Sequence, residues 1–164
     1  MKLPYTDTKP VGAADFYFAI NATFRFILES LGPDALRRYW TGLGESYFAP
    51  VSEDWRAGGL PAVAAYWRDF FQAEPGAQVE VDEGSSEVVV RVNTCPAIAH
   101  LRGGARDIVP CFCQHCWFIG EAMSAKAGFT VRVEGGNGSC RQVFRTADPA
   151  LPPQQLSAIK EATC

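Results

Sequence analysis

Apolar residues in the first part of the chain recur at the three- and four-residue intervals that are typical of one face of a helix. This spacing predicts a helix over residues 13–31, and the Gly32-Pro33 pair predicts its end and the start of a second helix over residues 33–47. A third helix is predicted over residues 60–72. The shared face of the first helix consists of Phe16, Ile20, Thr23, Phe24, Ile27 and Leu31.

The period of the pattern changes after residue 77. Residues 78–82 and 87–93 alternate valine with other residues, which is typical of paired strands that bury one face. A second hairpin is predicted over residues 129–145, around the glycine-rich turn 135–138. Between the two hairpins, the sequence predicts a helix over residues 107–126, which contains the cysteines and the histidine of the segment 111–116.

This order of elements predicts the fold class. Strands and helices are grouped in pairs and do not alternate singly, which favours an α+β fold over a doubly wound parallel sheet. We expect an antiparallel four-stranded sheet, made of two hairpins, with helices packed on one face and a helical N-terminal region. All 164 residues are predicted to form one domain: a helical part over residues 11–73, the hairpins and cysteine-bearing helix over residues 77–146, and a tail over residues 147–164.

Composition and charge narrow the range of partners. The chain is 48% hydrophobic and 20% charged with a net charge of −3, and it has no basic stripe, so nucleic acid is not an expected partner. No apolar run approaches the roughly 20 residues that a membrane-spanning helix needs. The first ten residues lack a hydrophobic signal core, which predicts a cytoplasmic location. Because cytoplasmic thiols stay reduced, disulfides are not the expected role of the cysteines.

The cysteines are distributed unevenly. Of the six, none precedes Cys95, five lie between Cys95 and Cys140, and the last is Cys164. Cys113 and Cys116 form a C-x-x-C pair near the start of the predicted helix, where both sulfurs can reach one point. A helix start carries partial positive charge, which favours the thiolate form that binds metals and attacks electrophiles.

Two further cysteines lie at strand boundaries. Cys95 ends the first hairpin and Cys140 begins the last strand, so all four sulfurs meet if the hairpins pair side by side. The set Cys95, Cys113, Cys116 and Cys140 suits Zn²⁺ or, as the alternative, an iron–sulfur cluster. His100 or His115 would be able to replace one cysteine. Two other interpretations remain open: a metal-free reactive thiol, and plain packing of small apolar side chains.

Other residues are candidates for catalysis or substrate binding. Cys113 is the candidate nucleophile, His100 lies in a predicted loop where function is common, and Glu121 is a candidate general base. Arg141 and Arg145 are candidates for binding a substrate carboxylate. For Glu121 and the two arginines, a solvent-facing position is the alternative interpretation.

The second half of the chain resembles a known family. Cys95-Pro96, Phe112-Cys113 and the run 138–144 resemble motifs of the L-2-amino-thiazoline-4-carboxylic acid hydrolase family, and the outline is similar to a vinyl-reductase-type small-molecule-binding domain. The resemblance implies a hydrolase that opens a thiazoline ring by attack on an amidine-like carbon. Cys95, Cys113 and Cys140 fall on the family's cysteines. Cys116 stands where the family carries an acidic residue, which puts the parent reaction in question.

Three functions follow as hypotheses. The first is a hydrolase acting on C–N bonds, or a lyase, whose substrate is a small sulfur- or nitrogen-containing metabolite and whose cysteine cluster is a metal site or a nucleophile. The second is a vinyl-reductase-type ligand- or metal-sensing module with a structural zinc or iron–sulfur site. The third is a thiol redox protein using Cys113 and Cys116, which the lack of a preceding βαβ unit disfavours. Aromatic residues on the first helix are compatible with a homodimer.

Overall fold

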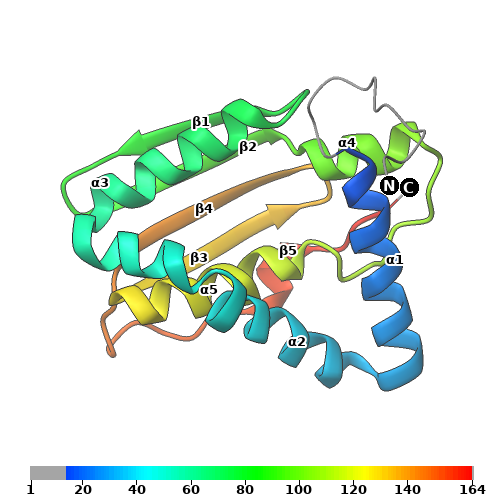
Figure 1. The fold of residues 1–164 in the computed structure, drawn as a ribbon, viewed down its shortest axis with the longest axis horizontal. Helices are drawn as coiled ribbons and strands as arrows, with labels where there is room; N and C mark the ends of the chain where they lie inside the picture. Colours follow the sequence, from blue (N-terminus) through cyan, green and yellow to red (C-terminus); the bar gives the residue numbers. More distant parts are fainter. Residues whose placement is uncertain (1–13, 164) are drawn as a thin grey trace, which may run out of the picture.

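The computed structural model describes residues 14–163, so the first residues used above to predict location, and Cys164, lie outside the described part. The α+β class is confirmed (Figure 1). In chain order, the elements are α1 (Ala14–Leu31), α2 (Pro33–Gly42), a π-helical segment (Leu43–Tyr47), α3 (Ala49–Ala73), β1 (Gln78–Glu83), β2 (Glu87–Thr94), α4 (Pro96–Gly103), α5 (Gln114–Ala127), β3 (Phe129–Gly136), β4 (Ser139–Thr146), a 3₁₀ turn (Leu156–Ala158) and β5 (Ile159–Lys160). None of these helices is both long and apolar enough to cross a membrane.

The N-terminal helices follow the predicted pattern with two differences. The stripe on α1 is buried at its centre, at Phe24, but Phe16 at one end and Leu31 at the other are 60% and 67% exposed. Helix α3 begins eleven residues before the predicted start and contains a kink at Gly59, whose φ of 68° is the left-handed conformation that glycine adopts without strain.

The sheet differs from the predicted one. It has five strands in the order β1-β2-β4-β3-β5, and β5 pairs with β3 in parallel, so the prediction of an antiparallel four-stranded sheet is wrong. The four long strands do form the two hairpins and pair antiparallel. The fifth strand comes from the tail and is only two residues long, which is too short to show an alternating pattern.

The central helix begins later than predicted, at Gln114 and not near residue 107. Long-range partners hold the preceding segment in a non-helical conformation. The Asn21 side chain donates to the carbonyl of Asp107 and accepts from the Val109 N–H, while the Ala162 N–H donates to the carbonyl of Pro110. These bonds satisfy backbone groups that a helix would otherwise pair internally. Cys113 therefore becomes the N-cap residue of α5, and Cys116 lies in its first turn.

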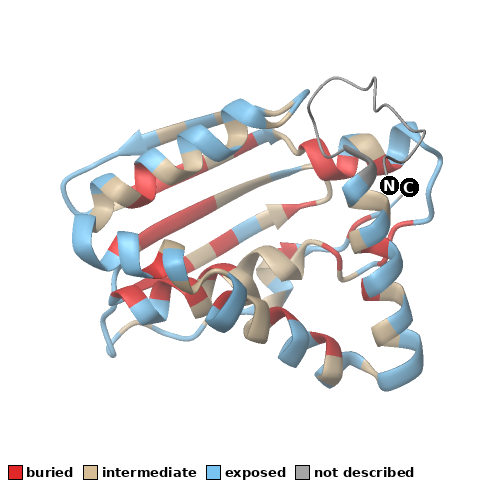
Figure 2. Cartoon of the chain, in the orientation of Figure 1, coloured by how far each residue is buried: buried red, intermediate tan, exposed pale blue. Residues whose placement is uncertain are grey.

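Two apolar clusters form the core (Figure 2). In the first, α3 and α5 pack on one face of the sheet, around Trp55, Val90 and Phe144. In the second, α1, α2 and α4 surround Trp40 and contact the segment before α5. Cys95 and Cys113 pack against both clusters, so the cysteines lie at the seam between them.

Candidate metal centre and ligand pocket

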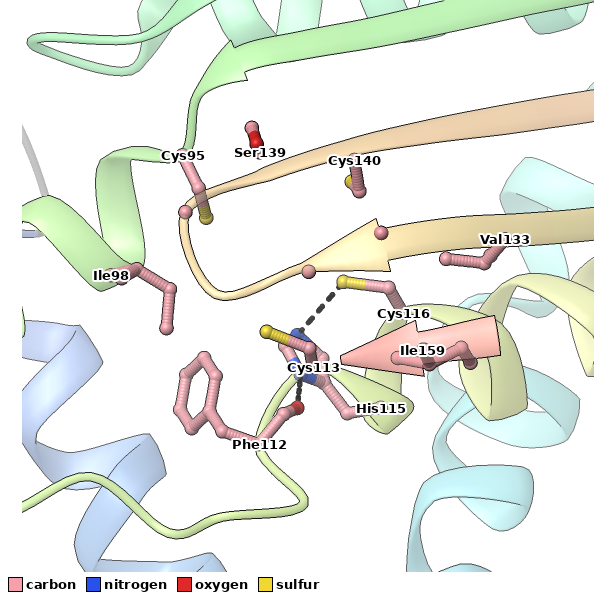
Figure 3. Close-up of a pocket in the computed structure, with 13 residues that line it drawn as sticks. Cys95, Ile98, Phe112, Cys113, His115, Cys116, Val133, Ser139, Cys140 and Ile159 are labelled. Atoms are coloured by element: carbon pink, nitrogen blue, oxygen red, sulfur yellow. Dashed lines mark hydrogen bonds between the residues drawn. The ribbon is translucent and has the colours of Figure 1, made fainter. Parts of the chain in front are cut away.

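The four cysteines predicted as metal ligands come from three separate segments that meet at one end of the sheet. Cys95 is the N-cap residue of α4, directly after β2, and its N–H donates to the carbonyl of Gly138 in the β3–β4 turn at 2.8 Å. Cys140 lies at the start of β4, opposite Gly135 on the neighbouring strand. Together with Cys113 and Cys116, these residues line one cavity of about 30 Å³ (Figure 3). That volume suits one water molecule or one metal ion, and not an organic substrate.

The Asn-Gly turn that places Cys140 also reaches Cys113. Asn137 and Gly138 both have positive φ, which is typical of the tight turn that joins two antiparallel strands. In this conformation the Asn137 N–H donates to the Cys113 sulfur at 3.3 Å. Arg102 holds the turn from outside by donating to the Asn137 side-chain oxygen and to its backbone carbonyl.

Other sulfurs also receive hydrogen-bond donors. The Gln142 side-chain amide donates to the Cys140 sulfur at 3.8 Å, and the backbone amides of Ala97 and Ile98, at the start of α4, favour the Cys95 thiolate. Such N–H···S contacts stabilise thiolates and tune cysteine-ligated metal sites. Three of the four sulfurs therefore have donors that would stabilise a thiolate.

His115 is neutral and faces Cys116. Its Nδ1 lies 2.5 Å from the carbonyl oxygen of Phe112, which can only accept, so Nδ1 carries the proton. Nε2 therefore keeps its lone pair and accepts from the Cys116 thiol, with 3.7 Å between Nε2 and Sγ. Burial lowers the pKa of His115, which agrees with the neutral form.

Burial also raises the pKa of all four thiols. The pKa of Cys95 and that of Cys116 rise to about 11, and that of Cys113 to about 12. The pKa of Cys140 is raised as well, first by burial and then by its proximity to Cys116. The Asn137 N–H, followed by Arg102, opposes the rise in the pKa of Cys113 without cancelling it. At neutral pH the four thiols therefore stay protonated unless a cation offsets the cost of burying their charge.

A larger apolar pocket of about 170 Å³ adjoins the cysteine cavity. Cys95, His115, Cys116 and Cys140 line both spaces, whereas Cys113 lines only the smaller one. No Asp, Glu, Lys or Arg belongs to the described lining of this larger pocket. Its other lining residues are Tyr17, Phe48, Tyr66, Trp67, Phe70, Phe71, Val92, Pro96, Ala97, Ile119, Gly120, Met123 and Gln142.

The two other predicted catalytic residues lie elsewhere. His100 packs on the ring of Phe18, with 4.6 Å between the ring centroids, and lines neither the cysteine cavity nor the apolar pocket. Glu121 accepts hydrogen bonds from the Thr130 hydroxyl and the Val131 N–H, which ties α5 to β3. The structure thus gives Glu121 a structural partner and does not bring it to the thiols.

Arg141 and Arg145 also lie away from the site. They alternate along β4 with Cys140 and Gln142, so their side chains lie on the opposite face of the sheet. Both face Glu87, at 4.0 Å and 3.4 Å respectively. The structure does not bring either guanidinium to the cysteines, as carboxylate binding there would require.

The sequence does not separate several pocket residues from the core. Tyr17 and the α3 aromatics have the spacing of core residues, and nothing in that spacing separates a pocket wall from a core. Gln142 had one available signal, since it follows Cys140 by two positions in a strand and therefore shares its face. For His115 the sequence predicts only a substitute ligand or a buried, hydrogen-bonded side chain.

Metal binding would require the four cysteine side chains to rearrange. Among residues 14–163, no three His, Cys, Asp or Glu side chains are already arranged as a metal site. The chemistry of the four thiols nevertheless fits a soft ion, because they share one ion-sized cavity and three of them receive N–H donors. Comparison of the chain with models of known protein families and with curated protein sequences finds no match. The resemblance to the thiazoline hydrolase family therefore stays a prediction.

Proposed function

We propose that this protein is a small-molecule-binding module in which Cys95, Cys113, Cys116 and Cys140 hold one zinc ion, and in which the adjoining apolar pocket takes an uncharged ligand. The observation that carries the proposal is the convergence of four thiols from three chain segments on one ion-sized cavity. A reducing compartment such as the cytoplasm suits it, because the five described cysteines are all free.

The protonation of the thiols supports a metal in preference to a free nucleophile. Burial keeps Cys113 and Cys116 protonated at neutral pH, so neither is ready to attack a substrate unaided. A bound Zn²⁺ would supply the positive charge that makes four thiolates tolerable in this interior. The amide donors at Cys95, Cys113 and Cys140 would then stabilise the bound thiolates.

The number of cysteines favours binding over catalysis. Four thiolates complete the tetrahedral coordination of zinc and leave no open position for substrate or water. The described lining of the adjoining pocket also contains no Lys or Arg that would bind a carboxylate. Both features support a ligand-binding or sensing role.

One observation favours a second candidate, a hydrolase acting on C–N bonds of a small nitrogen- or sulfur-containing compound. Cys95, Cys116 and Cys140 face the ligand pocket, whereas Cys113 does not. If these three cysteines alone held the metal, the fourth position would be available for a metal-bound water or for polarising a C=N bond. The neutral Nε2 of His115 lies at the same boundary and would accept a proton.

Elemental analysis of anaerobically purified protein tests the metal site. We expect near one zinc per chain in the wild type, and loss of the metal in Cys116→Ser and Cys140→Ser. Cys111→Ser is the matched control, because Cys111 lines a separate surface pocket with Arg37 and Gln114 and should retain full occupancy. Metal-free wild-type protein, or equal occupancy in all variants, would rule the zinc site out.

Cys113→Ser separates the two candidate functions. For the four-cysteine binding site, this variant should lose zinc as the other two do, and the wild type should not hydrolyse thiazoline compounds. For the hydrolase, Cys113→Ser should keep its zinc, and the wild type should release product from a thiazoline substrate. Retained zinc together with turnover would therefore replace the binding proposal by the enzymatic one.

A further inference from the structure

Tyr17 lines the apolar pocket and connects α1 to the end of α3. Its hydroxyl donates to Oε2 of Glu74 at 2.6 Å, and Glu74 is the C-cap residue of α3. Tyr17 lines the pocket, while Glu74 lies outside the lining. The Glu74 carboxylate thus fixes the Tyr17 phenol group from outside the pocket lining.

This hydrogen bond decides what Tyr17 can offer to a ligand. A phenol has a single proton, and here that proton is committed to Glu74, so the oxygen can only accept a further hydrogen bond. Burial, followed by the hydrogen bond to Glu74, raises the pKa of Tyr17, so the hydroxyl stays neutral at physiological pH. Cys95 and Cys116 add to the rise, which agrees with a hydroxyl on the cysteine side of the pocket.

The rest of the pocket limits the size and charge of the ligand. A cavity of about 150 Å³ lined by apolar side chains holds one benzene molecule, so 170 Å³ suits a molecule of about one ring. A charged ligand would lose its hydration without gaining an ionic partner from the described lining, which is costly. In the same lining, one N–H of the Gln142 side-chain amide is already occupied, because it donates to the Cys140 sulfur.

We propose that Tyr17, fixed by Glu74, is the specificity-determining residue of the pocket and selects a neutral, ring-sized ligand that donates a hydrogen bond to the Tyr17 oxygen. The inference rests on the ligand pocket of the proposed function, but not on the metal. It assigns the chemical class of the ligand, which the apolar walls alone leave open.

Three ring-sized probes test the proposal by calorimetry on the full chain: aniline, a neutral donor; toluene, which has nearly the same shape and no donor; and benzoate, which is charged. The wild type should bind aniline roughly threefold to tenfold more tightly than toluene, the usual effect of one hydrogen bond, and should not bind benzoate. Tyr17→Phe should bind the first two equally, with its toluene affinity unchanged. Tyr39→Phe, on α2 and outside the pocket, should keep the wild-type preference.

Glu74→Ala adds a readout that loss of packing would not give. Freed from the carboxylate, the Tyr17 hydroxyl can donate, so benzonitrile, a ring-sized acceptor, should bind more tightly than to the wild type. If no probe binds the wild type, the ligand pocket of the proposed function fails. If probes bind but aniline has no advantage, or Tyr17→Phe keeps that advantage, the role of Tyr17 is overturned while the pocket stands.

Discussion

Each cysteine sulfur of the site lies in surroundings that oppose its ionisation, yet most receive a hydrogen-bond donor. At Cys113, burial raises the pKa to about 12 although the Asn137 N–H and Arg102 both favour the thiolate. The two effects make sense together if the thiolate exists only with a cation bound. Burial then excludes water and competing reactions, and the donors share the negative charge of the bound sulfur.

The raised thiol pKa values predict how the stability of metal-free protein depends on pH. In the unfolded chain a thiol ionises near its ordinary pKa of 9.0, whereas Cys116 in the folded protein ionises near 11. The unfolded state therefore binds fewer protons between these values, and the stabilisation from Cys116 is full below pH 9 and lost as pH rises toward 11. A difference of two pKa units corresponds to about 3 kcal/mol.

Thermal unfolding in the presence of a chelator measures this effect. The midpoint of wild-type protein should fall steeply between pH 9 and 11, and Cys116→Ala should show a shallower fall because it lacks one of the thiols. Zinc-loaded protein should behave differently, since its ligands are already deprotonated. A metal-free midpoint that stays constant over this range would contradict the buried, protonated thiols.

At the scale of the elements, the short strand β5 holds the cysteine-bearing segments together. It pairs with β3 at Gly135 and Gly136. Just beyond it, the Ala162 N–H donates to Pro110, and the Thr163 N–H donates to the Asn137 side chain. Strand β5 and the three residues after it thus contact both the turn before Cys140 and the segment before Cys113.

Gly136→Ala is expected to weaken the pairing of β5 with β3 beside the cysteines. Gly136 has a φ of 134°, and an added Cβ would lie 2.7 Å from the Lys160 carbonyl oxygen and 3.3 Å from the Cys113 Cβ. Backbone strain alone costs about 1–3 kcal/mol, and displacing β5 adds to it. We expect a lower unfolding midpoint, faster zinc release to a chelator and faster alkylation of Cys113.

Gly76→Ala is the control for backbone strain. Gly76 also has a positive φ, 78°, but an added Cβ would meet nothing within 4 Å, and the residue lies in the turn before β1. This variant should lose about 1–2 kcal/mol of stability and keep wild-type rates of zinc release and alkylation. Equal rates in the two glycine variants would show that β5 does not hold the site.

The same elements show what sequence can predict here. Alternating valines predict the first hairpin, and the glycine-rich turn 135–138 predicts the second, because both signals are local. The boundary between α1 and α2 is predicted correctly, because Gly32 and Pro33 themselves mark it. The predicted start of α5 is wrong because Asn21 and Ala162, both distant in sequence, hydrogen-bond to the backbone of the segment before the helix. Likewise, β5 exists only through its contact with β3, and two residues cannot show a period.

At the scale of the whole molecule, the cysteines join two cores. Cys95 and Cys113 pack against the sheet cluster around Trp55 and also against the helical cluster around Trp40. The ligand pocket is built across the same seam, since Tyr17 comes from α1 and Trp67 from α3. An ion bound by these cysteines would therefore also change the walls of the pocket.

This shared wall predicts coupling between metal and ligand. Because Cys95, Cys116 and Cys140 line both spaces, zinc should fix three side chains that a pocket ligand contacts, and should tighten aniline binding by about tenfold, a usual size for such coupling. Linkage requires that aniline tighten zinc binding by the same factor. The two titrations, aniline with and without zinc and zinc with and without aniline, measure the factor twice. Equal factors above one would establish that the cysteine site and the pocket work as one unit, whereas a factor of one in both would mean that the metal is structural and the pocket acts alone.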